Sequence, residues 1–296
     1  MFCFIILHYI VTEVTIKCVE SILNNVKGTY QIIIVDNSSP NDSYNTLKEY
    51  FKSYKNVILI KNERNDGFAD GNNFGYKYAM QHFDAEYICA MNNDMEINQN
   101  DFIKVIEDLH EQYKFGVLGP DIYSAFAGYH QNPEVKTIRT YDEVCKQLLY
   151  FKKRKRKKYI FFIKGFLKNL QVFKLIYGKI RIYKNKKKPY IQQNVFNTAL
   201  HGSCLIFSKE YISKRDYLFY PKTKFYCEAQ ILDYECRRDG ILMMYSPYLK
   251  VTHYEDLATN AAMKNEIKKM KFVNECMINS LNEFKILMEN DKKRKN

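Results

Sequence analysis

Short apolar runs alternate with amphipathic stretches through the first 119 residues of the chain. The apolar runs predict buried strands at residues 2–8, 31–36, 57–60, 87–91 and 116–119. The stretches between them predict helices over residues 12–23, 43–53 and 69–82, with a further helix beginning near Gln99. Strands and helices that alternate in short units indicate an α/β fold, in which a mostly parallel central sheet is flanked by helices.

The pattern changes after residue 119. Residues 120–150 are less regular, and the remainder predicts a strand after a tight turn, a helix, two short strands and a long amphipathic helix, at residues 201–207, 225–240, 241–245, 249–252 and 260–290. We therefore expect three parts, residues 1–119, 120–259 and 260–296, of which the first is a nucleotide-binding half and the last a helix with a basic tail.

Polar residues follow two of the predicted strands directly. Asp36 ends the second strand, and Asn92, Asn93 and Asp94 follow the strand that begins at Tyr87. Ligands bind at the carboxyl ends of strands in open α/β sheets, and cations that neutralise phosphate oxygens prefer carboxylate ligands there. An Asn/Asp turn between a strand and a helix explains the same residues without any ligand.

The loop at residues 62–75 is rich in glycine and asparagine, and it runs into a predicted helix. Such a loop can form tight turns and present backbone N–H groups to an anion. Polar loops of this composition are common, so the loop alone is a weak signal.

Composition adds a large core and one localised basic segment. The 296 residues are 46% hydrophobic and include 20 Phe and 25 Tyr, enough for one large or two coupled domains. The net charge is +13, but residues 151–190 contain 16 Lys or Arg and no acidic residue, which leaves 30 basic and 33 acidic residues elsewhere. The positive charge therefore belongs to this segment and not to the whole protein.

The cysteines and the N-terminus suggest a cytosolic protein. The eight cysteines are scattered without a CxxC pair, which favours reduced, buried thiols over disulfides or a zinc site. The apolar N-terminal run lacks the basic region and cleavage site of a signal peptide and is too short to span a bilayer, so we interpret it as the first strand.

Several separated motifs agree in order and spacing with those of a known family. They are Ile6-Leu-His-Tyr9, Ile34-Val-Asp-Asn-Ser38, Asn65-Asp-Gly-Phe-Ala-Asp-Gly-Asn-Asn73, Met91-Asn-Asn-Asp94, Gly119-Pro-Asp-Ile-Tyr123, His130-Gln-Asn-Pro133, Leu200-His-Gly-Ser203 and Thr252-His-Tyr-Glu-Asp256. From residue 3 to about 260 the chain resembles glycosyltransferase family 2, the inverting nucleotide-sugar enzymes with a GT-A fold. It is most similar to the bacterial branch that builds capsular and related surface polysaccharides, including rhamnosyltransferase-like members.

The resemblance implies a donor site and a metal site. Asp36 is expected to hydrogen-bond the uracil or thymine of a UDP- or dTDP-sugar in a pocket lined by Tyr9, and Asp94 and His253 are expected to hold Mn²⁺ or Mg²⁺. The remaining donor-binding candidates lie near the ribose and pyrophosphate or in the DXD-type motif, here Asn-Asn-Asp; they are Asn37, Arg64, Gly67, Asn72, Asn92 and Asn93. A lone histidine is usually structural, and His253 gains weight only beside Asp94.

The resemblance also implies a catalytic base. A carboxylate across the sugar from the phosphates can take the proton of the attacking hydroxyl, and Glu228 is the candidate, with Asp233 as the alternative. A first-turn acid that stabilises the helix dipole explains Glu228 equally simply. Two departures stand out: Ala229 replaces the second acid of the family's pair, and Ile10 stands where relatives often have Asn.

Candidates for the acceptor side lie in two short motifs. They are His130 and Gln131 in the first, and His201, Gly202 and Ser203 in the second. A purely structural turn accounts for each motif equally well. With them, residues 1–119 form the nucleotide-sugar half and residues 120–259 the acceptor half, which includes the basic segment.

The basic segment allows three interpretations: a solvated face, a nucleic-acid arm or a membrane-surface element. Its cationic clusters alternate with the apolar stretches 159–163 and 170–180, a pattern typical of an interfacial helix on anionic lipid. Nucleic-acid arms usually lack such apolar content, so residues 151–190 favour an anionic membrane surface and no nucleic-acid partner.

Together these features predict a metal-dependent, inverting glycosyltransferase. It would move a sugar from a nucleoside-diphosphate sugar to a glycan or lipid-linked glycan, as a peripheral protein at the cytoplasmic face of the membrane. Two other hypotheses remain: an inactive nucleotide-sugar-binding homologue, suggested by Ala229, and a basic nucleic-acid-associated protein, suggested by residues 151–190. The oligomeric state is left open.

Overall fold

The computed structural model describes residues 1–134, 137–156, 190–254 and 265–295. Within these residues ten strands form one sheet: β1 (Phe2–His8), β2 (Tyr30–Asp36), β3 (Val57–Lys61), β4 (Tyr87–Asn92), β5 (Met95–Glu96), β6 (Val117–Ser124), β7 (Tyr129–His130), β8 (Val195–Phe196), β9 (Cys204–Ser208) and β10 (Met243–His253). The helices are α1 (Thr12–Asn25), α2 (Ser43–Phe51), α3 (Phe68–His82), α4 (Phe102–Tyr113), α5 (Tyr141–Arg156), α8 (Lys209–Ile212), α9 (Glu228–Arg238) and α11 (Glu266–Lys295).

The sheet is mostly parallel, as predicted. Its strand order is β3-β2-β1-β4-β9-β6-β10-β5, with β7 on β6 and β8 on β10. The first four strands run parallel, and β6 and β10 are also parallel to each other. Four strands run antiparallel to their neighbours: β9 between β4 and β6, and the two-residue strands β7 on β6 and β5 and β8 on β10. Strands of both predicted halves thus share one sheet, and the division into parts stays a prediction.

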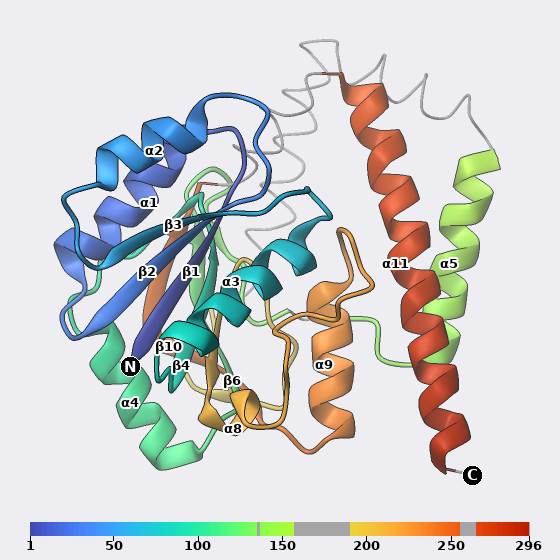
Figure 1. The fold of residues 1–296 in the computed structure, drawn as a ribbon. Coiled ribbons are helices and arrows are strands. Elements are labelled where there is room, and N and C mark those ends of the chain that lie inside the picture. Colours follow the sequence, from blue (N-terminus) through green and yellow to red (C-terminus); the bar gives the residue numbers. More distant parts are fainter. Residues whose placement is uncertain (135–136, 157–189, 255–264, 296) are drawn as a thin grey trace.

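Helices cover both faces of the sheet (Figure 1). Alternate residues of the buried strands face opposite sides, so each strand contributes to two cores. One core packs α1, α2 and α4 against side chains such as Phe4 and Ile34, and the other packs α3, α8 and α9 against side chains such as Ile5 and Val35. This arrangement is the predicted α/β fold with a central sheet between helices.

A third cluster joins α9 to two helices outside the sheet. α5 and α11 lie side by side and run in opposite directions (Figure 1). Leu148 of α5 and Phe284 of α11 pack with Ile231 of α9 in this cluster. The helix that begins with Glu228 is therefore packed on both sides, by the sheet core and by the pair of outer helices.

Four details differ from the sequence predictions. Residues 141–156 form α5 where irregular structure was expected, because only a narrow stripe of this helix is buried. The predicted strands 241–245 and 249–252 are one strand, β10, with a bulge between Ser246 and Lys250. The two-residue strand β5 was not predicted, and it delays the start of α4 from Gln99 to Phe102.

The cysteines fit the expectation of free thiols. All eight lie in the described part of the chain, each is unpaired, and only Cys145 is not buried. Most of the basic segment 151–190 and the start of the predicted helix 260–290 lie outside the described residues.

Candidate active site

The carboxyl ends of β1, β2 and β4 bring the predicted donor residues to one edge of the sheet. His8 pairs with Asp36 and Leu7 pairs with Asn92, so these strands end at the same level. Tyr9, Asn37 and Asn93, which follow the three strand ends, therefore emerge together, as expected for a ligand site in a parallel sheet.

Asp36 has one carboxylate oxygen free for a ligand. The residue is fully buried, and its Oδ1 accepts a hydrogen bond from the Ser39 backbone N–H at 2.7 Å. Oδ2 is also buried and has no hydrogen-bond partner in the structure. A buried acceptor without a partner is costly, and the imide N–H of uracil or thymine would satisfy it.

A neutral histidine, His8, pairs with Asp36 in the sheet register. His8 is fully buried, and burial lowers the pKa of its imidazole to about 4 although the nearby Asp36 carboxylate opposes the shift. The ring nitrogens contact Thr15 Oγ1 at 2.6 Å and Ser43 Oγ at 3.0 Å. His8 therefore fixes α1 and α2 at the strand ends without adding charge beside Asp36.

Ile10 occupies a left-handed backbone position. Its φ is 65°, and its N–H donates to Ser39 Oγ at 3.0 Å. Asparagine tolerates this conformation far better than a β-branched residue does. The departure at Ile10 thus concerns the backbone turn, and the hydrogen bond of the turn is made regardless of the side chain.

The asparagine- and glycine-rich loop is held by side-chain amides. Asn37 Nδ2 donates to Asn65 Oδ1 and to the Gly67 carbonyl, each at 3.1 Å, and Asn62 Nδ2 donates to Asn37 Oδ1 at 3.1 Å. These bonds fix the turn that precedes the N-terminus of α3, where backbone N–H groups and the helix dipole favour an anion. Asn37 therefore holds the backbone of the loop that forms the predicted phosphate site.

Two further donor candidates differ in exposure. Asn72 is buried, and its Nδ2 donates to the Phe68 carbonyl at 2.9 Å, so its amide serves the helix. The Arg64 side chain is 81% exposed and pairs with Asp66 at 2.9 Å. A surface pair of this kind is weak, which leaves the Arg64 guanidinium free to turn towards a diphosphate.

Asp94 and His253 face each other at the same edge. β5 pairs with the end of β10, and the Tyr254 N–H donates to the Asp94 carbonyl at 2.9 Å, which holds the two side chains together. Asp94 Oδ1 lies 3.3 Å from His253 Nε2. The contact lacks hydrogen-bond geometry, and Oδ1 is buried without a hydrogen-bond partner.

The second ring nitrogen of His253, Nδ1, has a partner of its own. His253 Nδ1 lies 2.8 Å from Gln131 Oε1, and the tautomer that donates from Nδ1 to this oxygen leaves a lone pair on Nε2. An imidazole nitrogen oriented in this way by a neighbour is typical of a metal ligand. Two buried acceptors that face each other fit a divalent cation better than they fit each other.

The protein supplies few ligands at this position. Among the described residues, no group of three or more His, Cys, Asp or Glu side chains is placed to hold a metal ion. Mg²⁺ is commonly bound through one or two carboxylates together with substrate phosphates and water, so a two-ligand site fits a cation that binds with a nucleotide. Asn93 Nδ2 donates to Thr15 Oγ1 at 2.9 Å, which ties this side chain to α1.

Of the five acceptor-side candidates, Gln131, His201 and Ser203 lie in contact with His253 or with each other beside it, whereas His130 does not. The His201 ring packs edge-on against the His253 ring at 5.9 Å, and His201 Nδ1 lies 2.8 Å from Ser203 Oγ. Gln131 contacts His253 directly, as described above. His130 instead pairs with Asp121 at 2.7 Å, away from His253.

Gly202 links this turn to α9. A Cβ at Gly202 would lie 3.5 Å from the Ala229 Cβ, so the turn packs against the first residues of α9. The contact places His201 and Glu228 on neighbouring segments. Sequence reasoning missed Asn132, whose Oδ1 accepts from the His201 N–H at 2.6 Å and fixes the turn.

Glu228 is a buried carboxyl at the start of α9. It is 7% exposed, and its Oε1 has no hydrogen-bond partner. Burial raises the pKa of the Glu228 carboxyl to about 7, although hydrogen bonds from its own N–H, Thr223 and Tyr226 oppose the shift. A carboxyl with a pKa near the working pH is suited to general acid–base catalysis. The contact with Thr223 was not foreseeable from the sequence.

Asp233 has a different environment. It is fully buried, and its Oδ2 contacts Arg237 at 3.0 Å and Arg139 at 3.4 Å. Both guanidinium groups contact Oδ2, so this oxygen is not available to accept from a hydroxyl. These contacts favour Glu228 over Asp233 as a base.

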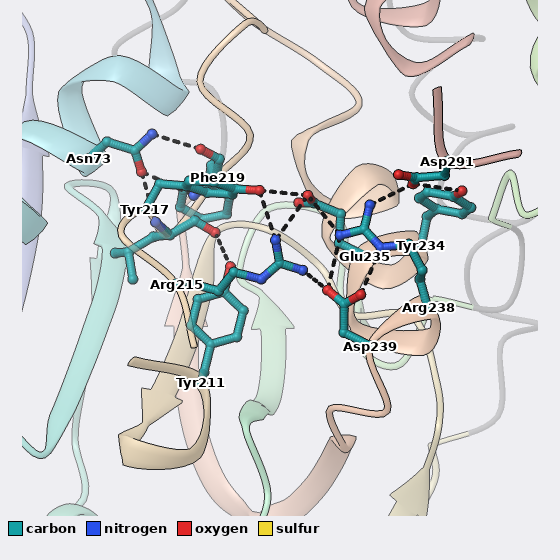
Figure 2. Close-up of polar contacts among 11 residues, drawn as sticks. Asn73, Tyr211, Arg215, Tyr217, Phe219, Tyr234, Glu235, Arg238, Asp239 and Asp291 are labelled. Atoms are coloured by element: carbon teal, nitrogen blue, oxygen red, sulfur yellow. Dashed lines mark hydrogen bonds and ion pairs between the residues drawn. The ribbon is translucent and has the colours of Figure 1, made fainter. Parts of the chain in front are cut away.

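A polar network fixes α9 relative to the donor loop (Figure 2). Asn73 of α3 accepts from the N–H groups of Leu218 and Phe219 at 2.9 and 3.0 Å. In the same loop, the Tyr217 hydroxyl donates to Glu235 of α9 at 2.6 Å. The helix with Glu228 and the helix that begins at the donor loop thus share one anchored segment.

The network continues to the outer helices. Arg238 contacts Asp291 of α11 at 2.5 Å, and the Tyr234 hydroxyl donates to the same carboxylate at 3.0 Å (Figure 2). Arg215 pairs with Glu235 at 3.4 Å and also with Asp239. α9 is therefore held at its C-terminal end while its N-terminal end carries the candidate base.

Comparison with known proteins identifies this arrangement. The model of the family described as glycosyl transferase family 2 matches residues 3–169, more than half of the chain. The chain belongs to glycosyl transferase family 2. This family 2 protein shares its mixed α/β fold with GT-A glycosyltransferases of known structure.

Two curated relatives of this family 2 protein are similar over shorter stretches. One is the low-salt glycan biosynthesis hexosyltransferase Agl10 of Haloferax volcanii, 26% identical over 35% of this chain and 32% of its own length. The other is the minor teichoic acid biosynthesis protein GgaB of Bacillus subtilis, 31% identical over 32% of this chain and 10% of its own length. The matched stretch thus spans a third or less of either relative.

Solved structures show the same fold at low identity. GalNAc-T7, crystallised with UDP, GalNAc and Mn²⁺, aligns over 86% of this chain and 44% of its own with a TM-score of 0.56 and 12% identity. S. aureus TarS aligns over 86% of this chain and 36% of its own with a TM-score of 0.50 and 11% identity. Among the described residues, none of the helices combines the length and apolar character needed to cross a membrane.

Proposed function

We propose that this family 2 glycosyltransferase is metal-dependent and inverting, and that it transfers a sugar from a UDP- or dTDP-sugar to a glycan of the cell surface. The observation that carries the proposal is the pair of facing acceptors, Asp94 Oδ1 and His253 Nε2, 3.3 Å apart and buried. The structurally similar protein GalNAc-T7 was crystallised with Mn²⁺, which supports a divalent cation at such a site.

The donor binds along the carboxyl ends of the first strands. Asp36 Oδ2 accepts from the base, and the N-terminus of α3 faces the diphosphate, with Arg64 as a mobile cation. Asp94 and His253 hold Mg²⁺ or Mn²⁺, which when bound neutralises the charge of the leaving nucleoside diphosphate.

Glu228 acts as the general base. The acceptor hydroxyl attacks the anomeric carbon from the face opposite the leaving phosphate, so the configuration inverts, and the proton passes to the Glu228 carboxylate. Ala229 stands where the family has a second acid, and the raised pKa of Glu228, about 7, supports Glu228 as a base that acts without a second carboxylate. The inactive homologue is the alternative, and the nucleotide-release assay below distinguishes the two.

The acceptor is proposed to be a lipid-linked surface glycan at the cytoplasmic face of the membrane. The names of both curated relatives, which concern glycan and teichoic acid biosynthesis, support an envelope polysaccharide. A capsular polysaccharide and a rhamnosyltransferase-like activity remain the specific form of the proposal. The last turn of α5, with Lys153, Arg154, Lys155 and Arg156, lies beside the exposed Leu149 and Tyr150, a combination suited to an anionic lipid surface.

A thermal-shift panel tests the donor and metal together. UDP, dTDP, GDP and their sugars are added with and without Mn²⁺, because a ligand that binds only the folded state raises the unfolding midpoint. We expect one nucleotide to stabilise the protein only with metal, in the wild type but not in Asp94→Asn. Positive pairs are then tested for nucleotide release with Glu228→Gln as the control. Stabilisation without release in the presence of a lipid-linked acceptor supports the inactive homologue, and no response to any nucleotide overturns the proposal.

A further inference from the structure

A cavity of about 800 Å³ opens beside β10, apart from the donor pocket. Among its walls are three tyrosines, Tyr123 on β6, Tyr190 before β8 and Tyr248 on β10, together with Asp121 and Lys250. Its volume is within the range of about 300–1,000 Å³ that is typical of ligand sites. None of the donor, metal or base residues described above lines this cavity.

The tyrosines present exposed ring surface from fixed positions. Tyr123, Tyr190 and Tyr248 are 42%, 36% and 58% exposed. Tyr190 stacks on the His130 ring at 4.1 Å with an interplanar angle of 23°, and Tyr123 lies 5.4 Å from the same ring. The Tyr245 hydroxyl donates to the Ile191 carbonyl at 2.9 Å, which holds the backbone next to Tyr190.

Tyr248 is placed by the bulge of β10. The strand register shifts between Ser246 and Lys250, and a bulge of this kind turns a side chain out of the sheet. Gln99 closes the bulge: its Nε2 donates to the Tyr248 carbonyl and its Oε1 accepts from the Lys250 N–H, both at 3.0 Å. The exposed ring is therefore part of a built wall and not of a loose loop.

The charges of the cavity's described lining are balanced. Asp121 is 4% exposed, and its Oδ1 contacts His130 Nδ1 at 2.7 Å. Lys250 pairs with Asp121 in the sheet register, and it is the only Lys or Arg among the described lining residues. A single ammonium group opposed by a carboxylate does not favour a phosphate or another polyanion.

The remaining polar lining consists of amides and a hydroxyl. Asn25, Asn98, Asn100 and Thr252 line the cavity and can both donate and accept hydrogen bonds. Uncharged hydrogen-bonding groups beside aromatic faces match the two surfaces of a sugar ring, its hydroxyl edge and its apolar C–H face. Tyrosine supplies such amphipathic contact area at a low cost in conformational entropy.

We propose that this cavity binds a neutral saccharide, namely sugar units of the acceptor chain that lie away from the bond being formed. This identification of the acceptor as a multi-unit glycan rests on the proposed function. Thr252 of the cavity wall directly precedes His253 on β10, and consecutive strand residues face opposite sides, so the cavity lies across the sheet from His253 near the same end of the strand. Recognition of remote sugars gives the enzyme a preference for longer acceptor chains.

An array of neutral and acidic oligosaccharides tests the proposal, with the full-length protein in EDTA and without nucleotide. We expect retention on one or more neutral oligosaccharides, reduced about tenfold or more in Tyr248→Ala and in Tyr190→Ala. Tyr54→Ala, which truncates a tyrosine elsewhere that is about as exposed as Tyr190, is the matched control and keeps wild-type retention. Equal unfolding midpoints of the variants show that the loss is local.

Three outcomes overturn the inference: no retained neutral oligosaccharide, unchanged retention in both cavity variants, or retention lost in Asp94→Asn. The last outcome would place the saccharide at the catalytic site instead. Retention that depends on Tyr248 but comes with no transfer from any nucleotide sugar supports the cavity and contradicts the proposed function, so the two failures are distinguishable.

Discussion

Replacement of Glu228 by Gln is expected to stabilise the protein while it abolishes transfer. Burial raises the pKa of this carboxyl from its ordinary 4.5 to about 7, so the folded protein keeps a proton there that the unfolded chain releases. Stability from this group is complete below pH 4.5 and is lost as the pH rises to about 7.

The size of the effect follows from the two pKa values. At 1.36 kcal/mol per pH unit, the interval from 4.5 to about 7 corresponds to about 3 kcal/mol lost from the free energy of unfolding above pH 7. Glutamine resembles the protonated carboxyl at every pH. The variant is therefore expected to be about 3 kcal/mol more stable than the wild type at pH 8, and nearly equal to it at pH 4.5.

Urea unfolding at pH 4.5, 6, 7 and 8 measures this difference. Glu111→Gln on the exposed side of α4 is the control and should follow the wild type at each pH. In the same series, transfer by the wild type should rise through about pH 7 to a plateau, and transfer by Glu228→Gln should fall roughly 10²–10⁴-fold. Lost transfer without pH-dependent stabilisation would refute the idea that a desolvated carboxylate is the base.

Three further predictions concern the metal, the donor loop and the anchor of α9. Asp94→Asn should lose the stabilisation by nucleotide with Mn²⁺, about 2.7 kcal/mol at a hundredfold excess over Kd, in a thermal-shift titration; a normal response would exclude Asp94 as a ligand. Gly67→Ala should cost about 3 kcal/mol or more in urea unfolding, because its φ is +114° and a Cβ would lie 1.8 Å from a backbone oxygen, whereas Gly240→Ala, with φ +64° and open space, should cost about 1 kcal/mol. Asp291→Asn should cost about 1–3 kcal/mol and lower kcat with KM nearly unchanged, since it removes the charge opposite Arg238; unchanged kcat would show that the anchor does not position the base.

Much of the fold could be predicted from the local pattern of hydrophobic and polar residues. β1, β2 and β4 were predictable because their apolar runs are continuous, and β10 was split because Pro247 and the bulge interrupt its pattern. α5 was missed because its long charged end outweighs the few residues that contact α11. Local pattern reports burial on a sheet better than burial along one narrow helix face.

In the candidate site, too, some residues could be predicted from local sequence and others could not. Asp36 and Asp94 were found because they end or follow strands, which is a local signal. The orientation of His253 by Gln131 and the contact of Thr223 with Glu228 arise from tertiary packing. The spacing of residues in the sequence does not indicate such contacts. The sequence could therefore predict the functional side chains but not their hydrogen-bond partners.

The place of β9 in the sheet has a consequence for synthesis on the ribosome. β4 and β6 leave the ribosome well before β9, which then fills the position between them, and β10 follows last beside β6. Until β9 arrives, the nascent chain carries unpaired strand edges that can pair with other chains. A product that ends after β6 would contain Asp36 and Asp94 but lack β9, so the edge of β4 opposite β1 would stay unpaired and open to association with other chains. We therefore expect premature termination to give an aggregation-prone product instead of a competitor for the sugar donor.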